Sequence, residues 1–246
     1  FHCNNCISNI QICKDSLIER QIKQFKRVDI TDISIVRGFM KDKINYPNIT
    51  YFDNKQFSST NMLVSLFTAL DKMNGDIIVS YGDIIFSQSL LEKLLKEKGD
   101  IVVSVDVSWE KYWLMRYGTI HYDTESLKLN QNNLIIRLGK PDPKNNDIDG
   151  RYVGLLKFSQ KGLHLITKIW KKYKDDYWNK PWQVSGKPMR QAYMTDMIQA
   201  LIDDNYQVHA SITRNGWIEF DTDSDYENAQ SWIRSGELKT ALGVET

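Results

Sequence analysis

Apolar residues recur along the first half of the chain at two spacings. Short apolar runs predict buried strands, and apolar residues three and four positions apart predict helices. The predicted helices are 15–25, 61–73 and 87–97. The predicted strands are 33–36, 49–52, 76–80 and 101–105. Strands that alternate with helices of this length predict an α/β fold, with a Rossmann-like, mostly parallel sheet flanked by helices.

The pattern changes near Trp109, where short strand-like runs follow one another. Residues 118–122, 127–129 and 134–138 predict an antiparallel meander, and 152–158 predicts one more strand. Further along, the predicted elements are helices 161–177, 193–204 and 224–233 and an edge strand 208–212. Polar residues that could cap the helices are Asp15 or Ser16, Ser59 or Thr60, and Asp223 or Ser224. We therefore expect one domain over 1–246 with a small antiparallel insert at 109–160.

Composition narrows the class of protein. The formal net charge of the 246 residues is +1 with basic and acidic residues interleaved, so nothing indicates nucleic acid or an anionic membrane as a partner. No apolar run is long enough to span a membrane, and no signal peptide is visible, so a cytoplasmic protein is expected. Cys3 and Cys6, with His2 beside them, have the spacing of half a zinc site, but no second pair of ligands follows.

Acidic residues follow two predicted strands that are far apart in the sequence. Asp83 follows the apolar run 77–79, and Glu219 and Asp221 lie in the segment 217–222. Ligands bind at the carboxyl ends of strands in open α/β sheets. Mg²⁺ prefers one or two carboxylates together with phosphate oxygens, so these acids suggest nucleotidyl transfer. Without other evidence, the Gly82-Asp83 pair can equally be explained as a turn. Asp223 and Asp225 are better explained as acidic residues at the cap and first turn of a helix.

Six short segments in order along the chain carry a resemblance to a known family. They are 16–22, 59–62, 81–83, 139–141, 152–154 and 217–222. Together they resemble the nucleotidyltransferases that activate sugar phosphates, above all the small bacterial cytidylyltransferases for choline phosphate, aminoethylphosphonate and phosphoglutamine. One departure is Gly139, which stands where the family usually has glutamate.

The resemblance implies an enzyme that transfers CMP from CTP to a small phosphate or phosphonate acceptor and releases pyrophosphate. Asp83 and Asp221 are implied to hold Mg²⁺, and Glu219 to bind it directly or to orient a water. Lys140 is implied to contact the acceptor phosphate, although a solvated turn lysine is an equal alternative. The resemblance also implies that the residues of two turns bind substrate; these are Thr60, Asn61, Tyr81 and Gly82.

The sequence does not identify the acceptor. An aromatic cage could select a quaternary ammonium through cation–π contacts, but core packing is the favoured interpretation, because aromatic residues bury large areas in any core. The aromatic residues considered for it are Trp109, Tyr112, Trp113, Trp178, Trp182 and Tyr193. Of these, Trp182 and Tyr193 are our candidates for substrate binding, and Arg116 would attract an acidic acceptor. A homodimer is also left open.

The family normally begins with a strand and a glycine-rich loop whose backbone N–H groups hold the triphosphate. Here Gly38 is the first glycine. We expect either that the loop precedes Phe1 in a longer chain, which the intact acidic pair favours, or that it has been lost. Two alternative functions follow: a sugar-1-phosphate nucleotidyltransferase that uses UTP or dTTP, and a catalytically silent module of the same fold that serves binding or regulation.

Overall fold

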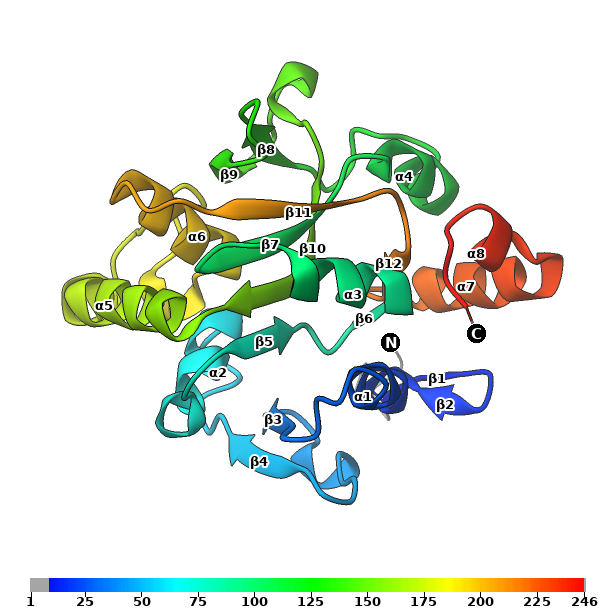
Figure 1. The fold of residues 1–246 in the computed structure, drawn as a ribbon, viewed down its shortest axis with the longest axis horizontal. Helices are drawn as coiled ribbons and strands as arrows, with labels where there is room; N and C mark the ends of the chain where they lie inside the picture. Colours follow the sequence, from blue (N-terminus) through cyan, green and yellow to red (C-terminus); the bar gives the residue numbers. More distant parts are fainter. Residues whose placement is uncertain (1–8, 246) are drawn as a thin grey trace.

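A four-stranded sheet is the centre of the computed structural model, which describes residues 9–245 (Figure 1). Its strand order is β11-β7-β10-β5. The bounds are β5 Ile77–Ser80, β7 Ile101–Asp106, β10 Arg151–Phe158 and β11 His209–Thr213. β11 pairs with β7 in parallel, whereas β10 pairs antiparallel with both β7 and β5. Three of the four strands therefore run in one direction, and β10 runs against them.

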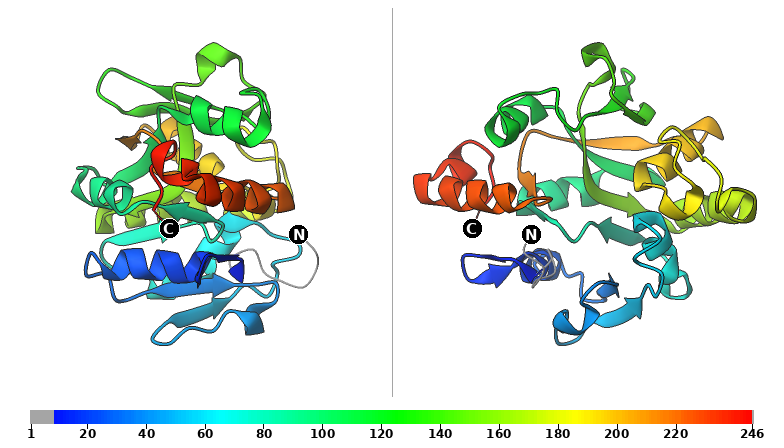
Figure 2. Two further views of the ribbon diagram at one scale, coloured as in Figure 1. Left: turned by 90° about the vertical axis from the view of Figure 1, so that its right-hand side faces the viewer. Right: turned by 180° about the vertical axis from the view of Figure 1, so that it is seen from behind.

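Four two-stranded pairs surround this sheet. Their strands are β1 Gln11–Ile12 with β2 Asp15–Ser16, β3 Ser34–Arg37 with β4 Thr50–Asp53, β6 Ile84–Phe86 with β12 Trp217–Glu219, and β8 Glu125–Leu129 with β9 Ile135–Pro141. Only β3–β4 is parallel among these pairs. The β8–β9 hairpin projects from one end of the molecule in all views (Figures 1 and 2).

Helices cover both faces of the sheet. Their bounds are α1 Leu17–Lys26, α2 Met62–Thr68, α3 Gln88–Lys96, α4 Trp109–Tyr117, α5 Gln160–Tyr177, α6 Met194–Asp203, α7 Asp223–Ser235 and α8 Glu237–Thr240. Short 3₁₀ turns lie at Lys41–Lys43, Leu70–Lys72, Asn145–Asp147 and Met189–Gln191. Among residues 9–245, no helix combines the length and apolar character that crossing a membrane requires.

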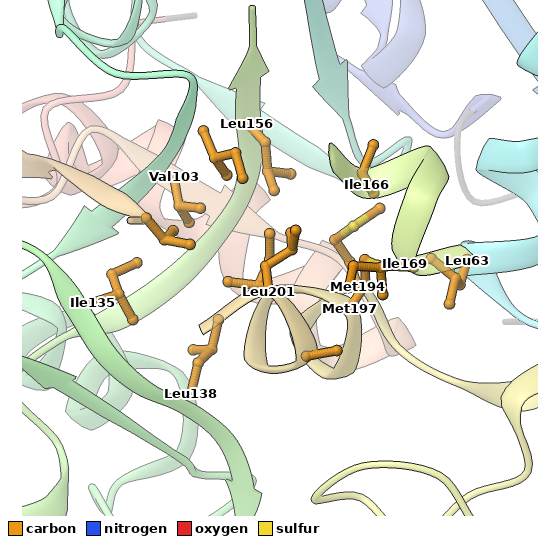
Figure 3. Packing of buried hydrophobic residues seen from close by; sticks show 14 of the residues in the cluster. Leu63, Val103, Ile135, Leu138, Leu156, Ile166, Ile169, Met194, Met197 and Leu201 are labelled. Carbon is orange, nitrogen blue, oxygen red and sulfur yellow. The ribbon is translucent and has the colours of Figure 1, made fainter. Parts of the chain in front are cut away.

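The buried side chains form two hydrophobic cores, one on each face of the sheet. Val103 and Leu156 belong to the first core, which α2, α5 and α6 cover with residues such as Leu63, Ile166 and Leu201 (Figure 3). The neighbouring strand residues Val102 and Leu155 belong to the second core, with residues of α1, α3, α4 and α7. Because successive strand residues point to opposite faces, a sheet covered on both sides needs continuous apolar runs, and the run at 101–103 is of this kind.

Most predicted elements are found, but the region after Trp109 differs from the prediction. Trp109–Tyr117 is a helix, α4, that was not predicted from the sequence. Residues 118–122 form no strand, and only 125–129 and 135–141 form the hairpin. β10 lies between β7 and β5 in the central sheet, so it is not part of an antiparallel insert as the range 109–160 implied.

The helix caps were predicted in part. Ser16 caps α1 in a capping box with Glu19, as expected. The cap of α2 is Asn61 instead of Ser59 or Thr60, and the cap of α7 is Thr222 instead of Asp223 or Ser224. The candidate zinc ligands Cys3 and Cys6 lie outside the described residues.

Candidate functional site

Pairing of β6 with β12 brings the two acidic segments together. Glu219 lies opposite Ile84 in this antiparallel pair, and the N–H of Phe220 donates to the C=O of Asp83 at 2.9 Å. Asp83 and Asp221 therefore flank the same end of the pair, although 138 residues separate them in the sequence. This arrangement matches the expectation that the two strand ends meet.

A third acidic segment joins them from the loop before β8. Single ligand oxygens of Asp123, Glu219 and Asp221 lie within 4.8 Å of one another. Asp123 and Asp221 are exposed and Glu219 is half-buried, so the oxygens are within reach of an ion from solvent. We call Asp83, Asp123, Glu219 and Asp221 the acid cluster.

Arg116 of α4 is the counter-charge of the cluster. Its side chain is only 1% exposed and makes ion pairs with Glu219, with Asp221 at 2.7 Å and with Asp225 at 2.6 Å. All three guanidinium nitrogens donate to carboxylates. The guanidinium also lies over the Tyr117 ring, 4.6 Å from its centre. Arg116 was predicted to attract an acidic substrate, but the structure commits its hydrogen bonds to the protein's own acids.

Two carboxyl groups of the acid cluster, those of Asp83 and Glu219, have pKa values raised towards neutral pH. Burial, reinforced by the negative charge of Asp221, raises the pKa of Asp83 to about 6. Burial also raises the pKa of Glu219 to about 7, against the opposing charge of Arg116. Burial acts in the same direction on Asp225, but the hydrogen bonds from Arg116 outweigh it and lower the pKa of that carboxyl. Desolvated carboxylates of this kind attract cations, because an opposite charge relieves their mutual repulsion.

A second polar group lies beside the cluster, where β8 and β10 begin. Arg151 is 7% exposed, and its guanidinium lies 4.0 Å from the centre of the Trp113 ring. Burial raises the pKa of Glu125 to about 6, while the charge of Arg151 opposes that rise. Arg151 also lowers the pKa of Glu219, so it lies within electrostatic range of both carboxyls.

Comparison with known proteins identifies the family. No model of a protein family matches the chain. The chain is 33% identical over 222 residues to the CTP:phosphoglutamine cytidylyltransferase of Campylobacter jejuni, a match that covers 86% of this chain and 85% of that protein. The chain belongs to the nucleotidyltransferase family.

A second relative matches over a shorter part of the chain. It is the bifunctional protein GlmU of Methanocaldococcus jannaschii, 30% identical over 145 residues, which cover 56% of this chain and 31% of GlmU.

Solved structures share the nucleotidyltransferase fold. The CTP:phosphocholine cytidylyltransferase of Streptococcus pneumoniae superposes with a TM-score of 0.67 at 15% identity, over 94% of this chain and 90% of that one. The inositol-1-phosphate CTP transferase of T. maritima superposes with a TM-score of 0.65 at 15% identity, over 92% and 86%. At this identity the likeness shows the fold, which confirms the predicted fold class.

The nucleotidyltransferase family generally uses a divalent metal, and the acid cluster fits one. Carboxylate oxygens are the ligands that hard cations such as Mg²⁺ and Mn²⁺ prefer. Asp123, Glu219 and Asp221 offer three oxygens close enough to share an ion. Asp83 is not in that group of three, but its pKa responds to the charge of Asp221, so it lies at the edge of the same site. The assignment of Asp83, Glu219 and Asp221 as ligands stays a prediction, to which the structure adds Asp123.

The turns predicted to bind substrate in this nucleotidyltransferase meet at Tyr81. The Tyr81 hydroxyl donates to the sulfur of Met62 at 2.6 Å, and the Asn61 side chain caps the same helix. The Tyr81 ring packs edge-on against Tyr152, with ring centres 5.7 Å apart. Gly82, the next residue, is half-buried and leads into Asp83. The turn after β5 and the start of α2 are therefore in contact, as substrate binding by both would require.

Thr60 and Lys140 have defined places beside these turns. The Thr60 hydroxyl accepts from Asn54 at 3.0 Å and donates to the C=O of Gln56 at 2.8 Å, so it stabilises the loop before α2. Lys140 is exposed on β9, and its N–H donates to the Ser126 hydroxyl. The neighbouring Pro141 lies opposite Glu125 in the hairpin. Roles for Thr60 and Lys140 in substrate binding stay predictions.

The aromatic residues considered for a cage are divided between the two cores. Trp109, Tyr112 and Trp113 pack in the second core, whereas Trp182 packs in the first, against Tyr173 with ring centres 5.9 Å apart. Tyr193 lies at the start of α6, and the Lys187 ammonium lies over its ring, 5.2 Å from the ring centre. These residues do not form one cage, and most of them serve packing. Substrate binding by Trp182 and Tyr193 stays a prediction.

Three residues of the site were not predicted from the sequence. Asp123 and Glu125 lie in a segment for which we expected only a meander, and Arg151 precedes a segment noted only for its resemblance to a family motif. A buried strand that begins with arginine was the available signal, because a buried charge is normally paired.

Proposed function

We propose that this nucleotidyltransferase is a Mg²⁺-dependent cytidylyltransferase that transfers CMP from CTP to a small phosphate or phosphonate acceptor. The observation that carries the proposal is the acid cluster, which three segments far apart in the sequence build in a chain 33% identical to a CTP:phosphoglutamine cytidylyltransferase. An oxygen of the acceptor attacks the α-phosphorus of CTP, the bond from that phosphorus to the bridging oxygen breaks, and pyrophosphate leaves with the electron pair.

The chain's own residues supply positioning and charge for this step. Asp123, Glu219 and Asp221, with Asp83 beside them, would hold Mg²⁺ next to the α-phosphate. When bound, the ion supplies Lewis-acid neutralisation of the phosphate charge and fixes the two reactants relative to each other. Arg116 favours the ionised form of these carboxyls and orients Glu219 and Asp221 through ion pairs. Such positioning is the main requirement of phosphoryl-type transfer, which needs little covalent chemistry from the protein.

The acid cluster also argues against the silent module. Four carboxyl groups gathered at one edge repel one another, and two of them have raised pKa values, so the arrangement costs stability without a cation. A module that only preserved the fold would gain stability by losing them.

The test is pyrophosphate release by the full-length protein. CTP, UTP and dTTP are each offered with Mg²⁺ and with phosphoglutamine, phosphocholine or inositol 1-phosphate, and also with glucose 1-phosphate for the sugar-phosphate alternative; a chelator serves as the control. We expect release with CTP and one of these acceptors that stops on chelation. Release with UTP or dTTP alone would favour the sugar-phosphate alternative, and no release with any nucleotide would refute transferase activity.

A further inference from the structure

The side chain of Gln21, on α1, is hydrogen-bonded to the turn that carries Asp83. Gln21 is 5% exposed, and its Nε2 atom donates to the C=O of Tyr81 and to the C=O of Ile84, both at 2.7 Å. These two carbonyls stand on either side of Asp83 in the sequence. One amide group of a distant helix therefore holds both ends of the turn.

The orientation of this amide follows from its partners. Carbonyl oxygens only accept hydrogen bonds, so the amide nitrogen has to face the two backbone groups. On its other side, the Ser80 hydroxyl donates to Gln21 Oε1 at 2.9 Å. An amide whose donors and acceptor are all in use is held in place, and it holds its partners in turn.

The C=O of Ile84 needs a partner outside the β6–β12 pair. Residues of an antiparallel strand alternate between bonding to the partner strand and pointing their backbone groups to the other side. The C=O of Asp83 accepts from Phe220, so the C=O of the next residue, Ile84, points away from β12. Ile84 is 1% exposed, and a buried carbonyl without a donor costs free energy. Gln21 supplies that donor.

Helix α1 is also packed against β6 one turn beyond Gln21. Phe25 lies on the same face of the helix, and its ring centre is 5.8 Å from that of Phe86. Gln24 donates to the C=O of Phe86 at 3.4 Å. Gln24 therefore makes a contact of the same kind as Gln21, but with a residue three positions beyond Asp83.

We propose that Gln21 is a positioning residue of the metal site, which acts by fixing the turn that presents Asp83 to the acid cluster. This inference rests on the proposed function, because it assumes that Asp83 helps to bind the metal. Gln21 is not itself a ligand, since its amide is used by the backbone of the turn and by Ser80. Loss of a group that orients a metal ligand typically weakens metal binding about 10- to 100-fold.

The experiment measures Mn²⁺ binding by the wild-type protein and by Gln21→Met. Methionine has a side chain of similar length but cannot donate to the two carbonyls. The dissociation constant of Mn²⁺, obtained from the paramagnetic resonance signal of the free ion, should rise about 10-fold. Gln24→Met is the matched control, because it makes the same change on the same helix and should leave the constant unaltered. A wild-type constant in Gln21→Met would overturn the proposal.

A double variant separates positioning of Asp83 from a general loss of stability. In a protein that already carries Asp83→Asn, Gln21→Met should change the dissociation constant by less than about twofold, because its effect passes through Asp83. A full additional loss in that background would show that Gln21 acts elsewhere. If Gln21→Met does not fold, Ser80→Ala removes the donor to Gln21 Oε1 instead. A raised constant in Ser80→Ala would then support the proposal, and an unchanged one would overturn it.

Failure of the proposed function gives a different result. If no acceptor supports pyrophosphate release but Gln21→Met still weakens Mn²⁺ binding, the role of Gln21 stands without the transferase activity. If release occurs and Gln21→Met binds Mn²⁺ as the wild type does, the proposed function stands and the role of Gln21 is refuted. A wild-type protein that binds no Mn²⁺ would refute the metal site and, with it, the role of Gln21.

Discussion

The N–H of Phe220 donates to the C=O of Asp83 at 2.9 Å, and this single backbone hydrogen bond closes the β6–β12 pair at the acid cluster. It uses no side-chain atom of Asp83, so the carboxyl is left for other partners. Substitution of the Asp83 side chain should therefore leave the strand pairing intact. A substitution at Asp83 can therefore remove activity while the fold of the protein is kept.

Asp83→Ala and Asp221→Ala should each lower turnover by at least about 100-fold while the protein stays folded. Each variant removes a carboxylate that neutralises or positions charge at the reacting phosphates. Pyrophosphate release and circular dichroism are the measurements. Asp175→Asn is the control, because Asp175 is exposed on α5, away from α7 in Figure 1. Near-normal rates in either alanine variant would contradict the assignment.

Asp83→Asn should raise the free energy of unfolding of the metal-free protein at pH 7.5 by about 1–3 kcal/mol. The pKa of Asp83 is about 6, above its ordinary 3.8, so the ionised carboxylate destabilises the native state at neutral pH. Between these two pKa values the native state binds more protons than the unfolded state. The advantage of the variant should therefore shrink as the pH falls from 7 to about 4.

Urea unfolding with a chelator present, at several pH values, measures this difference. A variant less stable than wild type at pH 7.5 would show that Asp83 contributes a favourable interaction instead. The same substitution should abolish turnover, so stability and activity should change in opposite directions.

Arg116→Met should lower the free energy of unfolding by about 3–5 kcal/mol, because it leaves buried carboxylates without their counter-charge. It should also move the acidic limb of the pH–rate profile to higher pH, since Arg116 lowers the pKa values of Glu219 and Asp83. Arg116→Lys should show smaller changes in the same directions. Arg234→Met is the control, since Arg234 is exposed on α7. An unchanged pH profile in a folded Arg116→Met protein would contradict this role.

Asp123→Asn should raise the Mg²⁺ concentration needed for half-maximal rate by about 10-fold, with a smaller effect on the rate at saturating Mg²⁺. Asp123 is exposed, so the substitution should barely alter stability. Rates measured over a Mg²⁺ titration, beside the Asp175→Asn control, test this. If the titration curve does not move, Asp123 is not a ligand.

The sequence predicted the elements whose patterns are local. The runs at 77–80 and 101–106 and the helices at 17–26 and 160–177 are close to the predicted bounds, because apolar spacing reports directly on burial. The meeting of Asp83 with Asp221 agrees with the sequence-based expectation that the two acidic segments come together, although the pairing of β6 with β12 that brings it about was not predicted.

Other features depended on contacts that a single sequence does not contain. α4 was missed because its aromatic residues favour strands, although Trp109, Tyr112, Trp113 and Arg116 are buried at helical spacing. The partners of Arg116 lie more than 100 residues away, so nothing local distinguished a buried counter-charge from a substrate ligand.

Asp225 has two tasks, since it accepts hydrogen bonds from the capping turn of α7 and binds Arg116 with both oxygens. A cation that draws Glu219 and Asp221 away from Arg116 would leave that arginine to Asp225 alone and tighten the first turn of α7. Amide hydrogen exchange at the start of α7 should then report on ligand occupancy of a site whose ligands belong to other segments. Helix α7 would then report on metal binding at residues outside it.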